Sequence, residues 1–189
     1  MAELLPFVEK HLDTIAQCLL RGGVVILPTD TVYGLACHPD HPEALERIRQ
    51  MKGRDADKPF QLLAADDNAV WRDGALRLPD IERLVMHWPG ALTLVFPTKK
   101  GHTEGYRVPK APLLQKLLAR CGGTLRCTSV NLSGEPPARD AKEARRILGD
   151  KVDLILDGGP ANLGIASTVA IIDLDGKYKI IRQGMIRLN

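Results

Sequence analysis

The sequence predicts an α/β fold in which a mixed, mostly buried β-sheet is flanked by helices. Two observations support this prediction. Short apolar runs bounded by glycine or proline, which are typical of strands, alternate with segments whose apolar residues recur at helical spacing. Near the C-terminus, two further apolar runs flank Asp175 and Gly176, a pair that favours a short hairpin. At least one antiparallel strand pair is therefore expected.

The chain begins with a predicted helix followed by a buried strand. Apolar residues recur at helical spacing from about residue 7 to residue 20. Gly22 and Gly23 then end the helix, because glycine is favoured just past a helix C-terminus. The apolar run VVIL at 24–27 follows directly and predicts the strand. The first unit is therefore helix, turn and strand.

A second helix is predicted to end just before a strongly charged loop. Asp40 and Glu43 have the spacing of a capping box at its start, and Gly53 breaks the helical pattern at its end. Lys52 is then the last helical residue, and Arg54 begins the loop. The segment KGRDADKP at this junction is either a solvated loop or a cationic clamp for an anion.

The remaining elements follow the same alternation. Further strands are predicted from apolar runs at 60–65, 91–96, 124–130 and 153–157. Helical patterns lie at about 79–87, 111–120 and 140–148. The segment from about 98 to 110 carries lysine and glycine without an apolar pattern, and it is predicted to be the longest irregular stretch.

Length and composition indicate one globular domain spanning residues 1–189. The hydrophobic fraction of 44% and the charged fraction of 26% are ordinary for a folded protein. No apolar run reaches the roughly 18 to 20 residues of a membrane span, and the N-terminus lacks the pattern of a signal peptide, so the expected location is cytoplasmic. The four cysteines show neither a C-x-x-C pair nor a zinc spacing, so reduced thiols and no metal site are expected.

Polar segments follow two of the predicted strands, at the positions where open α/β sheets usually bind ligands. The segment PTDTVYG at 28–34 follows the first strand, and TSVNLSGEPPAR at 128–139 contains the end of a later one. Their hydroxyl groups, amide and glycines suit a small polar ligand. The same residue types also form ordinary turns, so composition by itself leaves both interpretations open.

Several cations stand beside strand ends or glycine and proline turns. They are Lys52, Arg54, Lys58, Arg107, Arg139 and Arg182. A triphosphate requires several convergent donors, which arginine supplies well, whereas a net charge of +3 is too small to indicate nucleic-acid binding by bulk charge. Neither a P-loop nor a G-x-G-x-x-G motif occurs, and no hydrolytic triad is evident. Any nucleotide must be held in another way.

Taken together, the segments resemble one family, the YrdC-like threonylcarbamoyl-AMP synthases. The similar segments run in order along nearly the whole chain: LPTDTVYGLA, KGRDADKPFQLL, HWPGALTLVFP, YRVPKAPL, TSVNLSGEPPAR, GIASTVAIID and IIRQG. The resemblance implies a twisted, open mixed sheet flanked by helices, with a concave basic pocket. It implies a nucleotidyltransferase that forms threonylcarbamoyl-AMP and pyrophosphate from L-threonine, bicarbonate or CO2, and ATP.

The resemblance also assigns roles to residues. The K-x-R and S-x-N signature of the family falls on Lys52, Arg54, Ser129 and Asn131, which are expected to be catalytic. The residues expected to bind ATP are Arg54, Lys58, Ser129, Asn131, Arg139 and Arg182. The threonine side is expected to consist of Thr31, Arg107 and Ser167, with Arg107 as the partner of the substrate carboxylate.

The resemblance further implies Mg²⁺ on the ATP phosphates, held mainly through water, and partner proteins that transfer the threonylcarbamoyl group to tRNA. Two other functions are compatible with a basic groove. A module that binds double-stranded RNA or tRNA without catalysis would weaken steeply with salt and ignore threonine. A relative acting on carbamoyl phosphate would share the cationic clamp, but such domains normally belong to longer chains.

Overall fold

The computed structural model describes residues 2–53, 60–79, 81–132 and 134–188. The strands are β1 Glu3–Pro6, β2 Val25–Leu27, β3 Gly34–Cys37, β4 Gln61–Ala64, β5 Leu92–Pro97, β6 Thr103–Arg107, β7 Thr124–Ser129, β8 Leu154–Asp157, β9 Thr168–Ile172 and β10 Tyr178–Arg182. The helices are the 3-10 helix η1 Glu9–His11, then α1 Leu12–Leu20, α2 Pro42–Lys52, α3 Asp67–Asp73, α4 Glu82–Val85, α5 Pro112–Arg120 and α6 Ala141–Leu148. Within these ranges, no helix has the length and apolar character needed to cross a membrane.

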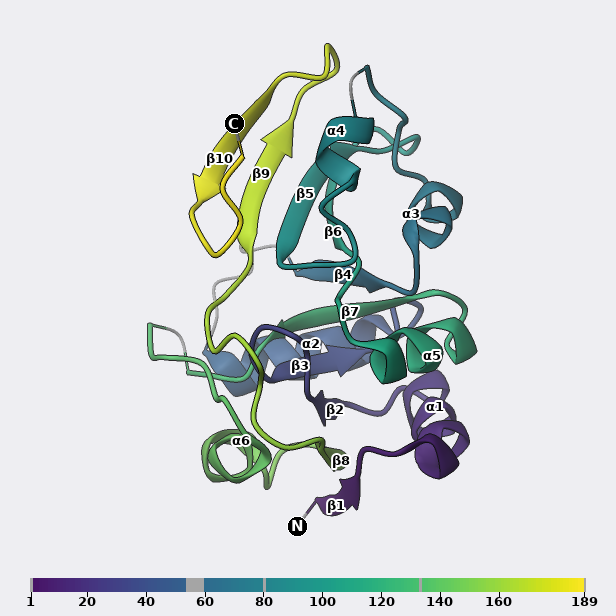
Figure 1. The fold of residues 1–189 in the computed structure, drawn as a ribbon. Coiled ribbons are helices and arrows are strands. Elements are labelled where there is room, and N and C mark those ends of the chain that lie inside the picture. Colours follow the sequence, from purple (N-terminus) through teal and green to yellow (C-terminus); the bar gives the residue numbers. More distant parts are fainter. Residues whose placement is uncertain (1, 54–59, 80, 133, 189) are drawn as a thin grey trace.

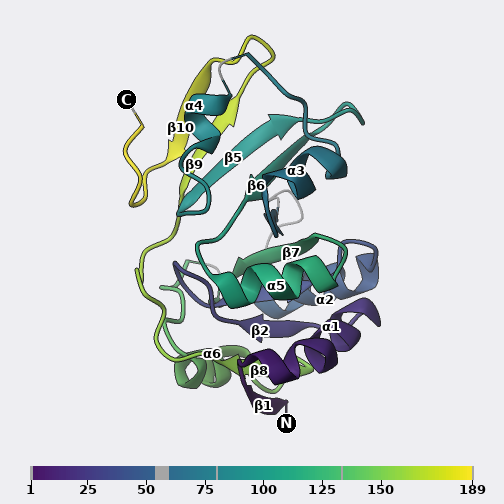
Figure 2. The same ribbon diagram turned by 45° about the vertical axis from the view of Figure 1, so that its right-hand side comes forward.

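All the described strands join one mixed sheet of ten strands, in the order β1-β8-β2-β3-β7-β4-β6-β5-β9-β10. The sheet contains parallel pairs such as β5 with β9 and antiparallel pairs such as β3 with β7, so the predicted mixed α/β sheet is confirmed. We call β1, β8, β2, β3 and β7 the first half-sheet, and the other five strands the second half-sheet. Strands β5, β9 and β10 run steeply relative to the first half-sheet in both views, whereas β4 lies nearly along β7 in Figure 1, which is consistent with a twist that accumulates along the sheet (Figures 1 and 2).

The two half-sheets differ in how helices cover them (Figure 1). Helices α1 and α5 pack on one face of the first half-sheet, and α2 and α6 pack on the opposite face. Helices α3 and α4 cover one face of the second half-sheet. Strands buried on both faces tend to have continuous apolar runs, and β2, β7 and β8 of the first half-sheet were predicted in this way.

The opposite face of the second half-sheet faces a cavity. Side chains alternate between the two faces of a strand, and β5 shows this clearly. Leu92, Leu94 and Phe96 are fully buried against α3 and α4, whereas Thr93 and Val95 line the cavity. The fold therefore supplies a floor of strand side chains that no helix occupies.

The C-terminal hairpin is confirmed. Strands β9 and β10 pair antiparallel, and their register shifts between Ile180 and Arg182. A bulge of this kind adds one residue to a strand and redirects its side chains. Ile181 and Arg182, although adjacent in sequence, both line the cavity. The bulge explains how two consecutive residues can do so.

Several element boundaries differ from the sequence-based expectation. The capping box at the start of α2 is wrong: the N-cap residue is His41, and no side chain caps the helix. The helix expected over 79–87 is reduced to α4, and α3 was not predicted.

Strands β1, β3 and β6 were also not predicted, and β6 lies within the stretch expected to be irregular. The reason is clearest for β6, because the residues it directs into the cavity are Thr103, Gly105 and Arg107. On the opposite face of β6, the buried Glu104 forms a salt bridge with Arg126, with 2.6 Å between Glu104 Oε1 and Arg126 Nη1. A strand with polar groups on both faces leaves no apolar run to detect.

His41 joins the end of α1 to the start of α2, and its protonation should affect stability. Its Nε2 lies 3.0 Å from the carbonyl oxygen of Leu20, and its Nδ1 lies 2.7 Å from Glu43 Oε1. Both contacts favour imidazolium, and the hydrogen bond to Leu20, followed by that to Glu43, raises the pKa of His41 above its usual 6.5. A raised folded-state pKa stabilises the protein below pH 6.5, and this contribution disappears as the pH rises through the folded value.

We therefore expect the melting temperature of the wild type to fall relative to that of His41→Ala between about pH 6 and pH 8.5. Thermal denaturation of both proteins across this range measures the difference. A difference that stays constant with pH would contradict the role of His41.

Candidate active site

One cavity of about 340 Å³ lies against the uncovered face of the second half-sheet, where it meets the first. Its strand floor consists of Gln61, Thr93, Val95, Thr103, Gly105, Arg107, Val169, Ile181 and Arg182. The remaining wall consists of Thr31, Val32, Lys52, Phe60, Cys127, Thr128, Ser129, Asn131, Gly134, Ala166 and Ser167. Among these lining residues there are lysine and arginine but no carboxylate, so the cavity is basic.

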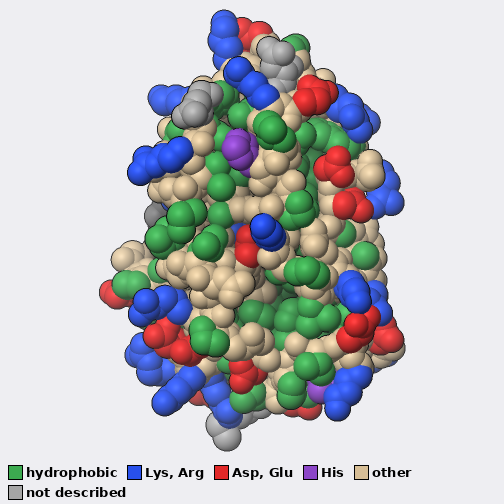
Figure 3. Space-filling model, viewed as in Figure 1, with side chains coloured by type: hydrophobic (Ala, Val, Ile, Leu, Met, Phe, Trp, Pro, Cys, Tyr) green, Lys and Arg blue, Asp and Glu red, His purple; other side chains and the backbone are tan. Residues whose placement is uncertain are grey.

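Lys52 and Arg107, two of the cations that line the cavity, are buried, unlike the exposed Lys and Arg side chains of the surrounding face. Lys and Arg side chains on the face seen in Figure 1 gather mainly toward its edges, and the middle is mostly hydrophobic or uncharged (Figure 3). Lys52 and Arg107 are only 4% and 1% exposed. A ligand that used both cations would have to enter the cavity.

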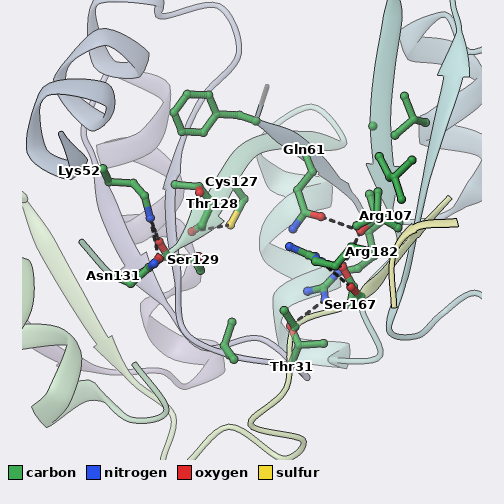
Figure 4. A pocket seen from close by; sticks show the side chains of 18 of the residues that line it. Thr31, Lys52, Gln61, Arg107, Cys127, Thr128, Ser129, Asn131, Ser167 and Arg182 are labelled. Atoms are coloured by element: carbon green, nitrogen blue, oxygen red, sulfur yellow. Dashed lines mark hydrogen bonds between the residues drawn. The ribbon is translucent and has the colours of Figure 1, made fainter. Parts of the chain in front are cut away.

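On one side of the cavity, Lys52, Ser129 and Asn131 form a hydrogen-bonded cluster (Figure 4). Lys52 comes from the last turn of α2 and donates from Nζ to the carbonyl oxygen of Ser129 and to Asn131 Oδ1, the latter at 2.7 Å. Ser129 Oγ donates to the same Oδ1 at 2.6 Å. The Asn131 amide nitrogen donates to the carbonyl oxygens of Leu132 and Glu135, which fixes its orientation. The cluster holds an ammonium group rigidly at the cavity wall.

On the other side, Arg107 is held by the segment that follows β2. Its Nη2 lies 3.2 Å from Asp30 Oδ1, and its Nη1 donates to Thr31 Oγ1 at 2.7 Å. Thr29 Oγ1 lies 2.9 Å from Thr31 Oγ1, and Lys110 donates its backbone N–H to Asp30. Burial lowers the pKa of Arg107, but the Asp30 charge opposes this effect. The result is a buried ion pair next to the cavity.

Next to this ion pair, a second set of polar side chains connects β10 to β4 across the cavity floor (Figure 4). Arg182 donates from Nε to the carbonyl oxygen of Ser167 and from Nη2 to Ser167 Oγ, at 3.0 and 3.1 Å. Ser167 Oγ lies 2.8 Å from Thr93 Oγ1, which donates to Gln61 Oε1 at 2.7 Å. Three of these four side chains end in uncharged polar groups, so the floor can make directional hydrogen bonds.

Cys127 lines the cavity but is not suited to act as a nucleophile. Burial raises the pKa of its thiol to about 12, although the charges of Arg107 and Lys52 oppose this. The thiol therefore stays protonated at neutral pH, and the thiolate is the reactive form.

We expect iodoacetamide at neutral pH to leave Cys127 unmodified in the folded protein and to react first with the partly exposed Cys18. Mass spectrometry of the alkylated protein tests this. We also expect Cys127→Ala to retain turnover within a few-fold. Rapid alkylation of Cys127, or loss of turnover in a folded Cys127→Ala protein, would show that the thiol takes part in the reaction.

The structure brings most of the residues singled out from the sequence to this cavity. They are Thr31, Lys52, Arg107, Ser129, Asn131, Ser167 and Arg182. Arg139 lies apart from them, in a second hollow lined also by Asp140, Glu143 and residues 160–164. The predictions for Arg54 and Lys58 lie outside the described residues.

Asp30, Gln61 and Thr93 were missed by sequence reasoning. Asp30 stands within PTDTVYG, where only its pairing with Arg107 reveals its place. Gln61 and Thr93 each interrupt an apolar run, in FQLLAA and ALTLVF. A single polar residue in an otherwise apolar strand is the signal that could have identified both.

In the ranges that the structure covers, no group of three or more histidine, cysteine or acidic residues could hold a metal ion. The cavity wall is also poorly suited to bind a metal ion. Asn131 Oδ1 already accepts hydrogen bonds from Lys52 and Ser129, so it is poorly placed to bind a cation as well. The described donor set does not fit a metal held directly by protein oxygens.

Comparisons with known proteins identify the family and the fold. A family model for Sua5, YciO and YrdC proteins, described as "Telomere recombination", matches residues 17–184. A threonylcarbamoyl-AMP synthase from Idiomarina loihiensis is 35% identical over 162 residues, which cover 78% of this chain and 87% of that protein.

Two solved structures also match. The crystal structure of P. abyssi Sua5 complexed with L-threonine has a TM-score of 0.87 at 27% identity, and the match covers 97% of this chain and 57% of that one. The crystal structure of E. coli YciO has a TM-score of 0.84 at 26% identity, and it covers 97% and 96% of the two chains. This chain thus corresponds to a little over half of the Sua5 chain and to nearly all of YciO.

Proposed function

Because the chain belongs to the Sua5, YciO and YrdC family, we propose that it is a threonylcarbamoyl-AMP synthase. Such an enzyme joins L-threonine, bicarbonate or CO2, and ATP, and it releases pyrophosphate. The observation that supports this best is the division of one cavity between two sides (Figure 4). One side carries a fixed ammonium group with hydroxyl and amide groups, and the other carries a buried arginine.

The proposed reaction requires no protein nucleophile. The threonine amine attacks CO2 and releases one proton to solvent, or it attacks bicarbonate with loss of water; either route forms a carbamate. A carbamate oxygen then attacks the α-phosphorus of ATP, the bond to the β-phosphate oxygen breaks, and pyrophosphate leaves with the bonding electrons. The protein supplies positioning and electrostatic stabilisation, which suits a cavity with many donors and a protonated thiol.

We assign the triphosphate to the side of Lys52, Ser129 and Asn131. Lys52 is 4% exposed and its ammonium donates to two oxygens, so its charge acts in a partly dehydrated site, where electrostatic stabilisation is strong. Arg182, on the strand floor, would also contact the nucleotide. Arg54, Lys58 and Arg139 remain proposed ATP contacts on the basis of the family resemblance.

We assign threonine to the side of Thr31, Arg107 and Ser167. Asp30 already balances the Arg107 charge. The guanidinium would therefore hold a substrate carboxylate through its remaining N–H groups, whose planar fork matches the two carboxylate oxygens. The two assignments would bring the amino acid and the α-phosphate into one cavity, as the reaction requires.

The further partners follow from this assignment. Mg²⁺ would bind to the ATP phosphates and water rather than to a protein cage, because the described cavity wall has no carboxylate. The threonylcarbamoyl group would pass to tRNA through separate proteins, which favours a cytoplasmic location. An RNA-binding module is less favoured, because Lys52 and Arg107 are buried in the cavity and could not contact a backbone lying across the surface.

The test is pyrophosphate release from ATP in the presence of Mg²⁺, bicarbonate and L-threonine, with each component omitted in turn. Release that requires threonine and bicarbonate together is the expected result. Release that ignores threonine, or binding of RNA that weakens steeply with salt in a protein without turnover, would overturn the proposal.

Ser167→Ala should chiefly weaken the use of threonine. The hydroxyl connects Arg182 to Thr93, and a hydrogen bond to a charged group is worth about 1.5–3 kcal/mol. We expect the KM for threonine to rise about tenfold or more, with a smaller change in the KM for ATP. Steady-state kinetics measure both constants, and Thr14→Ala, which removes an exposed hydroxyl on α1, is the matched control. An unchanged KM for threonine would refute this role of Ser167.

A further inference from the structure

Gln61 is the one half-buried residue of β4, whose other members are buried. It lies opposite Cys127 of β7, at the point where the two half-sheets join, and its side chain enters the cavity. Neither the family resemblance nor its position in an apolar run explains a glutamine there. Its hydrogen bonds give the explanation.

The hydrogen-bond chain across the floor has a defined direction. Arg182 can only donate, so Ser167 Oγ accepts from it at 3.1 Å. Ser167 then directs its own proton to Thr93, and Thr93 directs its proton to Gln61 Oε1 at 2.7 Å. In this arrangement, the hydroxyl protons of Ser167 and Thr93 both make hydrogen bonds. It requires the amide oxygen of Gln61 to face Thr93.

The amide nitrogen of Gln61 is consequently turned toward the cavity (Figure 4). Within the described part of the chain, Nε2 makes no hydrogen bond to another residue, and it is not sealed off from the cavity. It carries two protons and can act only as a donor. Because this series of hydrogen bonds begins at the Arg182 guanidinium, each hydrogen bond polarises the next. The Gln61 amide nitrogen is therefore a stronger donor.

The strand floor leaves room for a ligand beside this donor. A Cβ atom built on Gly105 of β6 would lie 3.6 Å from Thr93 Cγ2, 3.6 Å from Val95 Cγ2 and 3.9 Å from Gln61 Cβ. These are ordinary contact distances, so alanine would fit without displacing its neighbours. The glycine therefore keeps a small space open next to Gln61.

We propose that Gln61 is a substrate-binding residue whose amide nitrogen donates to a carboxylate oxygen, and that Thr93 is the positioning residue that orients it. The acceptor is expected to be anionic because the described lining contains cations and no carboxylate. This inference rests on the proposed function, which supplies two carboxylates. One is the α-carboxylate of threonine, and the other is the group that bicarbonate adds to the threonine amine.

Two substitutions of Gln61 distinguish a donor from a residue that only fills space. Gln61→Glu keeps the size of the side chain and an oxygen for Thr93, but it replaces the donor by a charged acceptor. Gln61→Met keeps the approximate size and loses both functions. A role that only fills space predicts near-wild-type KM values for Gln61→Met, and a role that only accepts from Thr93 predicts that Glu is tolerated better than Met. A donor to a carboxylate predicts that both substitutions raise the KM and that Glu is worse.

The measurements are the KM values for threonine, bicarbonate and ATP, together with the melting temperature of each variant. We expect Gln61→Glu to raise the KM for threonine or for bicarbonate at least tenfold, Gln61→Met to raise it less, and the KM for ATP to stay within about twofold. The substrate whose KM rises identifies the carboxylate. Gly105→Ala should raise the same KM without changing the hydrogen-bond chain. Gln17→Glu on α1, where the side chain is exposed, controls for the added charge.

The outcomes separate this inference from the function on which it rests. Equal kinetics for Gln61→Glu and wild type, or a Met variant worse than the Glu variant at equal stability, would overturn the inference alone. A folded wild-type protein without threonine-dependent pyrophosphate release would overturn the proposed function, and the inference with it.

Discussion

Lys52→Ala is expected to lower kcat/KM for ATP about a thousandfold, the loss typical of removing one preorganised charge at a site of developing negative charge. The ammonium is held by Ser129 and Asn131 in a buried position, so water could not replace it at the same place. Lys52→Arg should not rescue the activity, because a planar guanidinium cannot reproduce a compact ammonium at that position.

The stability of the same variant separates chemistry from folding. Removing the ammonium deprives two oxygens of a donor, which costs about 1–3 kcal/mol of unfolding free energy and leaves most of a domain's usual stability. Pyrophosphate release and urea denaturation measure the two effects. Lys142→Ala, on the exposed face of α6, is the matched control and should change neither. A folded Lys52→Ala protein with wild-type turnover would remove Lys52 from the proposed site.

Arg107→Met should lower both stability and the use of threonine. Arg107 is 1% exposed and pairs with Asp30, which is 5% exposed. Removing one partner leaves the other charge buried without compensation, which typically costs about 3–5 kcal/mol. The expected result is a large fall in the urea midpoint and loss of threonine-dependent turnover.

The double variant Asp30→Asn/Arg107→Met distinguishes the two consequences. It removes both charges, so much of the lost stability should return, because a buried ion pair often contributes little net stability compared with neutral residues. Turnover should not return, because the proposed carboxylate partner is still absent. Recovery of wild-type KM for threonine in the double variant would show that Arg107 serves the fold rather than the substrate.

Prediction from the sequence worked best where strands are buried on both faces. The apolar runs VVIL and DLILD correspond to β2 and β8, because a strand with neighbours on both faces has apolar side chains on both. It missed β1, β3 and β6, of which β6 borders the cavity. The alternation of Thr103, Gly105 and Arg107 in β6 looks irregular because these side chains line the cavity rather than an apolar core.

Some residues of the candidate site could be identified from the sequence, and others only from the structure. Thr31, Lys52, Arg107, Ser129, Asn131, Ser167 and Arg182 were identified through family resemblance, and the fold brings all of them to one cavity. Asp30, Gln61 and Thr93 were not identified. Their importance depends on which atoms face them, and hydrogen-bond partners such as Arg107 with Thr31 are separated by 76 positions in the chain.

The sequence by itself determined the mixed α/β class, the C-terminal hairpin and the family, because these depend on local periodicity, turn residues and ordered motifs. Only the tertiary structure decided that the second half-sheet keeps one face free of helices and that a bulge places Arg182 beside Ser167. It also decided the direction in which the Gln61 amide points. These features arise from contacts between distant strands, and such contacts follow from twist and register, which no local pattern specifies.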